Sequence, residues 1–421
     1  MNTDERVPFA RPLPPAAAPA VEIVRALQAA GHQALLAGGC VRDLLRGAEP
    51  ADYDVATSAG PDAVCGLFPR TRRVGVQFGV VLVRRQRRWV EVATFRTDGR
   101  YADGRRPESV TFARDARTDA LRRDFTINGM FLDPLAGVVL DYVDGRADLA
   151  ARRVRAIGEP AARFGEDYLR LLRAVRFAAR LDFALEPATL AAMRACAPRL
   201  RAVATERVLD ELERMLGHAG RAEAWRLLDE AGLLPHLVAR VEWSPAQAER
   251  VAEELARLPD DAPFELALAV AAAAFMPAQV HELCRGLTCS NDQRATVVWL
   301  VTHQADLDEP DAPTLAALKR LMACPAFALL ETLAGVRYAA LADGAARAAA
   351  LRQRVRAIDP AAVAPPPLVT GDDLAALGVP PGPCYRDVLE QVYTAQLDER
   401  LVSREEGLAL AAQLLGVDRP F

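Results

Sequence analysis

Two aspartates, Asp52 and Asp54, lie two positions apart in an alternating segment whose other members, Tyr53 and Val55, suit a packed interior. On a β-strand, residues two apart point to the same face, so both carboxylates are expected on one side of a sheet. Neighbouring carboxylates of this kind are what Mg²⁺ ions require for phosphoryl transfer. Asp52 and Asp54 are therefore predicted to be catalytic and to bind the metal.

A pair of glycines, Gly38 and Gly39, lies between an apolar run at residues 34–37 and a short helix expected over residues 40–46. Glycine lets the backbone turn sharply and approach a ligand closely, and a helix N-terminus offers free N–H groups to phosphate. Twelve residues separate Gly39 from Asp52, and this combination resembles the signature of the polymerase β-type nucleotidyltransferases. A phosphate is therefore expected to lie opposite the two carboxylates.

The elements that must position these groups form an α/β region, which is expected to end near residue 157. Alternation and valine content predict strands, whereas helical periodicity and glycine stops predict helices. The expected helices cover residues 21–30, 61–68 and 115–123, and the expected strands cover residues 71–76, 79–84, 88–95 and 138–143. Residues 1–20 are rich in proline and alanine, and we expect them to be a disordered leader.

Helical patterns dominate the rest of the chain. A single helix is expected over residues 164–181, with Arg170, Arg173, Arg176 and Arg180 at three- and four-residue spacing. One polar stripe on an otherwise apolar helix indicates burial on most sides, with one face on a cleft. Taken alone, the stripe favours a common alternative, which is a solvated arginine face.

The composition sets limits on the class of protein. The chain has 421 residues, which indicates two to four domains, and 51% of them are hydrophobic, which allows a substantial core. A net charge of −4 does not exclude nucleic-acid binding, because a local basic patch is sufficient. The seven cysteines are scattered and favour reduced thiols in a cytoplasmic protein. The longest apolar run, residues 266–276, is too short for a bilayer, so no membrane partner is expected.

Five motifs occur in order between residues 35 and 180. They are Gly-Gly-Cys-Val-Arg-Asp at 38–43, Asp-Tyr-Asp at 52–54, Glu-Val-Ala-Thr-Phe-Arg at 91–96, Arg-Arg-Asp-Phe-Thr-Ile-Asn at 122–128 and Glu-Asp-Tyr-Leu-Arg at 166–170. With these motifs the chain resembles the class II CCA-adding tRNA nucleotidyltransferases, a family that includes bacterial poly(A) polymerases. A weaker likeness extends to residues 205–207 and 370–374.

The resemblance implies an α+β fold, in which an N-terminal polymerase β-like nucleotidyltransferase domain of mixed sheet and helices precedes an all-α C-terminal half. It implies Mg²⁺ as the cofactor, CTP and ATP as substrates, and tRNA as the partner, bound at its 3′ acceptor end and elbow. The oligomeric state stays open. The expected parts are the disordered leader at 1–20, a catalytic head at 21–157, a helical neck for base recognition at 158–240, an RNA-binding body at 241–364 and a helical tail at 365–421.

The resemblance also implies site residues. It makes Glu91 a candidate third catalytic carboxylate and places the family's flexible loop at residues 97–107. Two departures from the family pattern, Tyr168 in place of proline and Gly129 in place of alanine, remove no functional group. The implied nucleotide-binding residues are Gly38, Gly39, Arg42, Arg123, Asp124, Asn128, Asp167, Arg170, Arg173 and Arg176.

Base selection follows from hydrogen-bonding chemistry. Cytosine and adenine each present an amino donor beside a ring-nitrogen acceptor, whereas uracil and guanine present the reverse. A carboxylate only accepts hydrogen bonds and a guanidinium only donates them. Asp167 and Arg170, three residues apart on the expected helix, would share a face and fit cytosine and adenine. Against uracil or guanine they would leave buried polar groups unpaired, so we expect this pair to select CTP and ATP.

The expected function is template-independent addition of CCA to the 3′ end of tRNA, with release of pyrophosphate. Two alternatives within the family stay open: an enzyme that adds only the terminal A, and a poly(A) polymerase. A non-enzymatic alternative is an RNA-binding scaffold with an inactive head. The presence of Asp52, Asp54 and Asp167 together argues against the scaffold.

Overall fold

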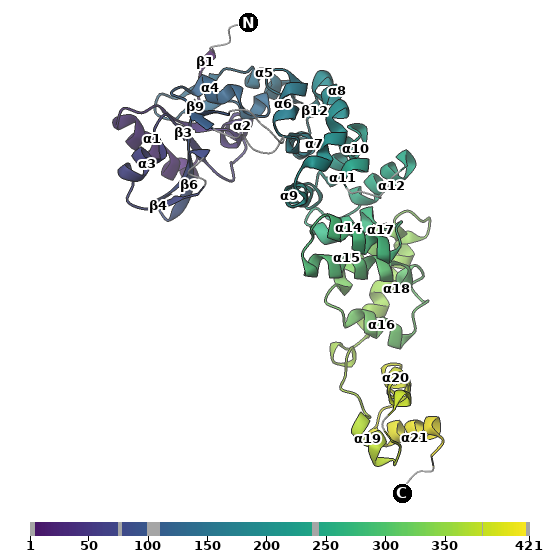
Figure 1. Cartoon of the computed structure of the whole chain (residues 1–421). Helices are drawn as coiled ribbons and strands as arrows, with labels where there is room; N and C mark the ends of the chain where they lie inside the picture. Colours follow the sequence, from purple (N-terminus) through teal and green to yellow (C-terminus); the bar gives the residue numbers. More distant parts are fainter. Residues whose placement is uncertain (1–4, 75–77, 99–109, 238–243, 381, 418–421) are drawn as a thin grey trace. The chain divides into compact units, whose positions relative to one another are not determined.

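The computed structural model describes residues 5–74, 78–98, 110–237, 244–380 and 382–417. The chain divides into two compact units, residues 1–252 with 286–288 and residues 253–285 with 289–421. The described part of the first unit contains a mixed sheet and helices, and the described part of the second is helical (Figure 1). This arrangement confirms the predicted α+β fold with a helical C-terminal half.

An eight-stranded mixed sheet forms the centre of the first unit, in the order β1-β10-β9-β2-β3-β6-β5-β4. Strand β3 runs antiparallel to β2 and parallel to β6, and β5 runs antiparallel to β6 and β4. The two remaining strand pairs, β7 with β8 and β11 with β12, lie outside this sheet. The strands are β1 (Glu5–Pro8), β2 (Ala34–Ala37), β3 (Asp54–Thr57), β4 (Thr71–Arg73), β5 (Val80–Arg85), β6 (Arg88–Thr94), β7 (Arg96–Asp98), β8 (Val110–Phe112), β9 (Phe131–Asp133), β10 (Val138–Asp141), β11 (Arg153–Val154) and β12 (Ala184–Leu185).

The two faces of this sheet have different roles. Ile23 and Leu27 of α1 pack with Val90 and Val92 of β6 in one hydrophobic core, which also receives residues of α3. Because side chains alternate along a strand, Glu91 points to the opposite face. The helical segments around the sheet are η1 (Pro15–Ala17), α1 (Ala18–Ala29), α2 (Gly39–Arg46), α3 (Pro61–Leu67), α4 (Ala116–Leu121), η3 (Thr126–Asn128) and α5 (Gly145–Ala150).

The strands and helices expected in the head are confirmed, with shifts of a few residues at their ends. Residues 75 and 76 of the strand expected at 71–76 lie outside the described residues. The disordered leader expected at residues 1–20 is wrong from residue 5 onward. Strand β1 pairs antiparallel with β10, and Phe9 and Leu13 pack against the core. The physical reason is that β10 would otherwise expose an unpaired sheet edge, and proline and alanine do not prevent the leader from covering it. From residue 99, the predicted flexible loop at 97–107 lies outside the described residues.

Further helices complete the first unit. Helix α7 lies among them, buried along most of its length, and packs against α9 and α10. This confirms that the arginine-striped helix is buried on most sides. The helices are α6 (Pro160–Glu166), α7 (Leu169–Leu181), α8 (Pro187–Cys196), η4 (Ala197–Ala202), α9 (Thr205–Leu216), α10 (Arg221–Glu230), α11 (Leu234–Leu237) and α12 (Pro245–Ala256), the last of which continues into the second unit.

The second unit is built of helices, and its last three enclose a small core around Leu374, Val388 and Ala411. In the described part of the chain, no single helix has the length and apolar composition of a membrane span; α16 and α17 meet both criteria only jointly, across a bend of 116°. The helices are α13 (Phe264–Ala271), α14 (Pro277–Gly286), α15 (Asn291–His303), η5 (Gln304–Leu307), α16 (Leu315–Met322), α17 (Phe327–Tyr338), α18 (Gly344–Ala357), η6 (Pro360–Ala362), α19 (Gly371–Ala376), α20 (Pro383–Leu397) and α21 (Arg404–Leu415).

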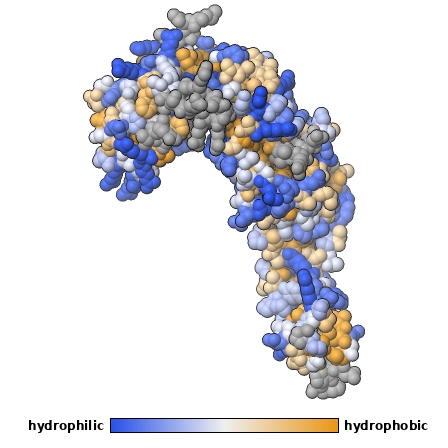
Figure 2. Space-filling view, in the orientation of Figure 1, coloured by the Kyte–Doolittle hydropathy of each residue, from blue (hydrophilic) through white to orange (hydrophobic). Residues whose placement is uncertain are grey.

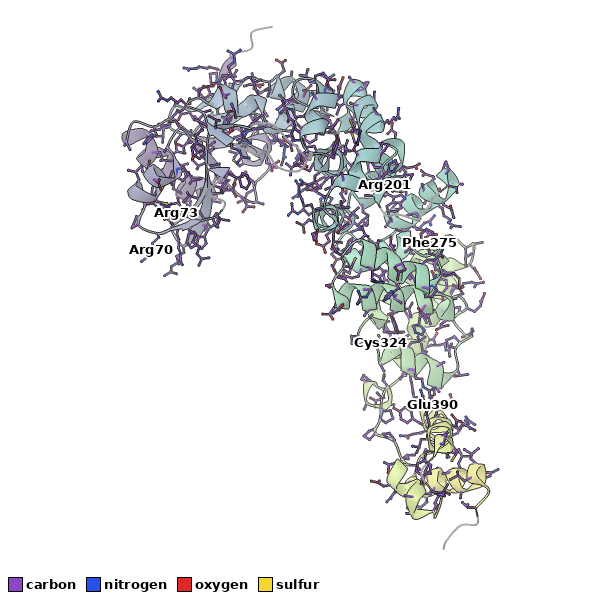
Figure 3. All side chains as sticks on the ribbon, viewed as in Figure 1. Arg70, Arg73, Arg201, Phe275, Cys324 and Glu390 are labelled. Atoms are coloured by element: carbon purple, nitrogen blue, oxygen red, sulfur yellow. The ribbon has the colours of Figure 1, made fainter. Side chains whose placement is uncertain are left out.

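The β4 edge of the head is rich in arginine. Hydrophilic residues dominate this part of the visible face (Figure 2). Arg70 and Arg73 mark the edge in Figure 3. The ion pair between Arg73 and Asp62, at 2.7 Å, joins β4 to α3.

Candidate active site

A cavity of about 630 Å³ lies between the head sheet and helices α7 and α9. All the residues predicted for the site from the sequence line this one cavity: Gly38, Gly39, Arg42, Asp52, Asp54, Glu91, Arg123, Asp124, Asn128, Asp167, Arg170, Arg173 and Arg176. Residues that sequence reasoning did not assign to the site also line it, among them Asp43, Phe177, Arg180 and Arg207. The fold therefore brings together motifs that are more than 100 residues apart in the chain.

The glycine turn joins the buried strand β2 to helix α2. Gly38 has φ +74° and ψ −131°, a backbone conformation that side-chain-bearing residues rarely adopt. A Cβ atom at this position would lie 3.1 Å from Nη1 of Arg123. Two features therefore favour glycine at this position, the backbone conformation and the close approach of Arg123. The first turn of α2, which follows, opens onto the cavity.

We expect Gly38→Ala to raise the KM for a nucleotide substrate about tenfold or more, because the turn must distort and Arg123 must move, and to lower the free energy of unfolding by about 1–3 kcal/mol. Steady-state kinetics and thermal unfolding measure the two effects. Gly31→Ala is the matched control, because Gly31 also has a positive φ of +85° but open space around it. An equal rise in KM for both variants would contradict the role assigned to Gly38.

The three carboxylates Asp52, Asp54 and Glu91 line the cavity on adjoining strands. Asp54 begins β3, with Asp52 two residues before it, and the pairing of Val55 with Val92 places Asp54 beside Glu91. Asp52 and Asp54 are exposed while Tyr53 and Val55 are buried, which confirms the predicted alternation.

The electrostatic surroundings of these carboxylates favour a cation. Enclosure at the cavity wall, followed by the charges of Glu91 and Asp52, raises the pKa of Asp54 to about 6. Burial and the charge of Asp52 also raise the pKa of Glu91, against the opposing effect of Arg96. Within the described residues, none of the three carboxylates forms a hydrogen bond or an ion pair through its side chain, and no group of three or more His, Cys, Asp and Glu side chains forms a complete metal site.

Two arginines beside the glycine turn are held by a layer of polar groups. Arg42 donates to the Oδ1 of Asn128 at 2.8 Å and pairs with Asp43 at 2.9 Å. Arg123 pairs with the buried carboxylate of Asp119 at 2.9 Å. Asn128 therefore acts on the cavity through Arg42, and Asp119 through Arg123.

The arginine stripe of α7 is anchored by two acids. Arg173 donates to Asp124 at 2.6 and 2.8 Å, and the Nε of Arg176 lies 2.5 Å from Glu211. Burial disfavours the charge on Asp124, but the charge and hydrogen bonds of Arg173 outweigh it and lower the pKa of Asp124 to about 2. In this structure Asp124 is thus the partner of Arg173, whereas the sequence predicts it to bind the nucleotide.

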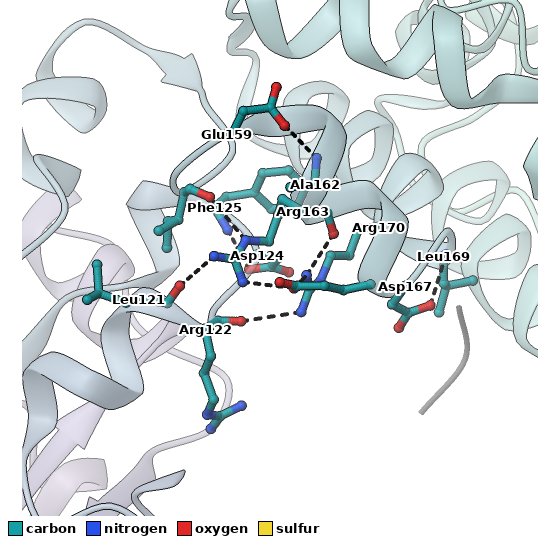
Figure 4. A network of polar contacts seen from close by, with 12 residues as sticks. Leu121, Arg122, Asp124, Phe125, Glu159, Ala162, Arg163, Asp167, Leu169 and Arg170 are labelled. Atoms are coloured by element: carbon teal, nitrogen blue, oxygen red, sulfur yellow. Dashed lines mark hydrogen bonds and ion pairs between the residues drawn. The ribbon is translucent and has the colours of Figure 1, made fainter. Parts of the chain in front are cut away.

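The helix expected over residues 164–181 is interrupted, so the prediction of one continuous helix is wrong. Helix α6 ends at Glu166 and α7 begins at Leu169. The Oδ1 of Asp167 accepts the backbone N–H of Leu169 at 3.0 Å, a local turn that competes with helical hydrogen bonding (Figure 4). Asp167 therefore lies before the first turn of α7 and does not share a helical face with Arg170, although both line the cavity.

Asp167 and Arg170 are each held by an ion pair with a different residue. Asp167 forms a two-pronged ion pair with Arg207 of α9, at 2.7 and 3.2 Å. Arg170 pairs with Glu166 and donates to the carbonyl oxygen of Arg163 at 2.8 Å. Figure 4 shows the contact between Arg170 and Arg163. Sequence reasoning did not assign Arg207 a role; the four-residue spacing of Arg207 and Glu211 on an amphipathic helix is the signal that could have identified both.

Comparison with known proteins agrees with this geometry. Residues 34–155 match the family described as the poly A polymerase head domain, and residues 182–242 match the family described as the probable RNA and SrmB-binding site of polymerase A. The crystal structure of the Bacillus stearothermophilus CCA-adding enzyme in complex with CTP is 30% identical, covers 96% of this chain and 98% of that chain, and has a TM-score of 0.78. This chain belongs to the CCA-adding enzyme and poly(A) polymerase family.

Other family members differ in how much of the chain they match. The CCA-adding enzyme of Geobacillus thermodenitrificans strain NG80-2 is 46% identical over 227 residues, which are 53% of this chain and 56% of that enzyme. The chain thus spans about half the length of the curated relatives it matches. The Thermotoga maritima CCA-adding enzyme complexed with tRNA_CCA is 18% identical, with a TM-score of 0.70 over 97% of this chain and 99% of that chain, and shows the shared fold.

Proposed function

We propose that this protein adds C, C and A to the 3′ end of tRNA from CTP and ATP, without a nucleic-acid template. The observation that carries the proposal is the cavity, in which the glycine turn, the carboxylates and the Asp167–Arg170 pair lie together. The likeness to the Bacillus stearothermophilus enzyme, whose crystal structure contains CTP, supports it over 96% of the chain.

Different residues of the cavity would contact different parts of the nucleotide. The triphosphate would lie against the Gly38–Gly39 turn and the first turn of α2, where N–H groups and the helix dipole favour anions. Arg42 and Arg123, both fixed by polar partners, would stabilise the charge that grows on the leaving pyrophosphate. The 3′-hydroxyl of the RNA would attack the α-phosphorus as the pyrophosphate leaves.

The residues present fit a divalent cation. The carboxylates of Asp52 and Asp54 form no side-chain hydrogen bond or ion pair among the described residues, and enclosure at the cavity wall, followed by the charges of Glu91 and Asp52, raises the pKa of Asp54. Mg²⁺ commonly takes one or two carboxylates and completes its shell with substrate phosphates and water, so Asp52 and Asp54 would hold it. Bound Mg²⁺ would supply charge neutralisation and a lower pKa for the attacking hydroxyl.

Asp167 and Arg170 would recognise the base through two hydrogen bonds of opposite direction, because one side chain accepts and the other donates. Asp167 would accept the exocyclic amino group of cytosine or adenine, and Arg170 would donate to the adjacent ring nitrogen. Arg207 forms an ion pair with Asp167, and Glu166 forms one with Arg170, so each side chain is held in position. The helical C-terminal half would contact the tRNA elbow through shape and phosphate contacts, and we place the enzyme in the cytoplasm.

The pH dependence of metal binding follows from the raised pKa of Asp54. Below about pH 6 the group is protonated and is a poor ligand, so the affinity for Mn²⁺ or Mg²⁺ is expected to rise about tenfold per pH unit below 6 and to level off above it. In the metal-free protein the raised pKa has the opposite effect on folding: stability decreases as pH rises from about 4 to 6. Calorimetric titration with Mn²⁺ at several pH values measures the first effect, and an affinity that does not change between pH 5 and 7 would contradict it.

A primer-extension assay tests the proposed function. The purified protein and Mg²⁺ are mixed with tRNA lacking its 3′ CCA and with tRNA ending in CC, and CTP, ATP or both are added. Addition of C, C and A followed by arrest is expected. Extension of only the CC-ended tRNA by one A would indicate an A-adding enzyme, a long A tail on many RNAs would indicate a poly(A) polymerase, and no incorporation would indicate a non-enzymatic RNA-binding protein.

A further inference from the structure

The catalytic face of the head sheet continues beyond the cavity to the β4 edge. Strand pairing places Leu82 of β5 opposite Glu91 of β6, and Arg72 of β4 opposite Leu82. Directly paired residues share a face of a sheet, so one row of side chains runs from Asp54 through Glu91 and Leu82 to Arg72. Three strand spacings of about 4.8 Å separate its ends, on the order of 14 Å.

Next to this row lies a cluster of two arginines and a tryptophan. Arg84 pairs with Trp89 across β5 and β6, on the same face as Leu82 and Glu91. The guanidinium of Arg72 lies 4.6 Å from the centre of the Trp89 ring, and that of Arg84 lies 5.8 Å from it. Such cation–π contacts order the guanidinium groups while leaving their N–H donors available. Trp89 itself remains 38% exposed.

The positive charge at this edge is not neutralised by the protein. Five arginines near the β4 edge form no ion pair within the described part of the chain: Arg70, Arg72, Arg84, Arg87 and Arg88. Two acids near this edge have other partners, because Asp62 pairs with Arg73 and Glu22 accepts from Gln86 at 2.5 Å. The exposed surface of Arg72, Arg84 and Trp89, which we name the edge cluster, therefore presents ordered, unneutralised cations and an aromatic ring.

We propose that the edge cluster binds the phosphodiester backbone of the RNA substrate a few nucleotides from its reacting 3′ end. The proposal rests on the proposed function, because it takes RNA as the molecule whose end lies at Asp52 and Asp54. Arginine and exposed aromatic rings are the groups that proteins use to track a nucleic-acid strand. A regular polyanion that starts at the carboxylates fits the cluster better than a membrane or an acidic protein, because the cluster lies on the same sheet face as the catalytic carboxylates.

The position expected for the triphosphate supports an RNA path that runs from the carboxylates toward the β4 edge. The glycine turn follows β2, and Arg123 lies beside it, on the β2 side of the carboxylates. In an in-line displacement the attacking and leaving oxygens lie on opposite sides of phosphorus. The RNA end would then approach from the β6 and β5 side, and the edge cluster lies there.

The test compares two double variants with the same change in charge. Arg72→Gln with Arg84→Gln removes the cluster's cations, and Arg6→Gln with Arg25→Gln is the control, on exposed residues of β1 at the opposite sheet edge and of α1 on the opposite sheet face. Binding of tRNA lacking CCA is measured in the full-length protein without nucleotide, between 50 and 200 mM salt. The cluster variant is expected to bind about tenfold more weakly, with a log–log salt slope reduced by about 1.5–2. The control should bind within about twofold of the wild type, by the same reasoning.

Kinetics and a third variant separate the remaining explanations. The KM for RNA should rise in the cluster variant, while kcat and the KM for ATP stay unchanged. Trp89→Leu should weaken RNA binding by about threefold with an unchanged salt slope, because it removes the ring that orders the two guanidinium groups but leaves their charge. Equal RNA affinity for the cluster variant and the control would overturn the proposal. It would also be overturned if the cluster variant kept its RNA affinity but no longer bound anionic phosphatidylserine vesicles, because the cluster would then bind membranes. Failure to add CCA would overturn only the proposed function, since RNA binding is measured without nucleotide.

Discussion

Asp54→Asn is expected to reduce nucleotide incorporation on the order of 1,000-fold or more, because it removes one of the two carboxylates proposed to hold Mg²⁺, whose charge stabilisation amounts to several kcal/mol. The fold should not suffer. Enclosure at the cavity wall, followed by the charges of Glu91 and Asp52, raises the pKa of Asp54, so the charge on Asp54 is unfavourable in the metal-free protein. Single-turnover kinetics measure the loss, and thermal unfolding should show an unchanged or higher Tm.

Asp62→Asn provides the control for Asp54→Asn, because Asp62 is an exposed aspartate on α3 that pairs with Arg73 outside the cavity. It should keep wild-type turnover. Mg²⁺ should raise the Tm of the wild type and of Asp62→Asn, but not that of Asp54→Asn. Turnover by Asp54→Asn within tenfold of the wild type would show that Asp54 does not hold the catalytic metal.

The second large effect concerns nucleotide choice. Asp167→Ala is expected to lower the preference for CTP over UTP by about 100-fold or more, because the mutant no longer accepts the cytosine amino group and no longer opposes the uracil carbonyl. The ratio of kcat/KM values for CTP and UTP, measured on tRNA lacking CCA, reports this change. Full discrimination against UTP in Asp167→Ala would rule out base reading by this residue.

Arg207 provides a separate test of how Asp167 is positioned. Arg207→Gln leaves the carboxylate in place but removes its two-pronged partner, so a smaller loss of discrimination in the same direction is expected. Asp210→Ala, on an exposed position of the same helix α9, is the matched control and should discriminate like the wild type. A wild-type CTP preference in Arg207→Gln would show that Asp167 holds its position without this ion pair.

The elements of the head could be predicted from local patterns. Alternating valines placed β5 and β6, the Gly38–Gly39 pair placed the turn before α2, and the order Asp52, Tyr53, Asp54 placed both carboxylates on one face. These features depend on backbone geometry and on side-chain periodicity, which act over a few residues. The leader was predicted wrongly because the pairing of β1 with β10 joins residues far apart in the chain.

Which groups pair across the cavity depends on how distant segments pack. The amino-acid sequence predicted the chemistry, a phosphate-binding turn with carboxylates and an arginine stripe, but it did not show that Asp124 pairs with Arg173 or that Asp167 pairs with Arg207. It also predicted one helix where the Asp167 side chain binds the Leu169 N–H and ends the helical pattern. The physical reason is that ion pairs between distant segments and local turns depend on where each side chain finds a partner, which periodicity does not encode.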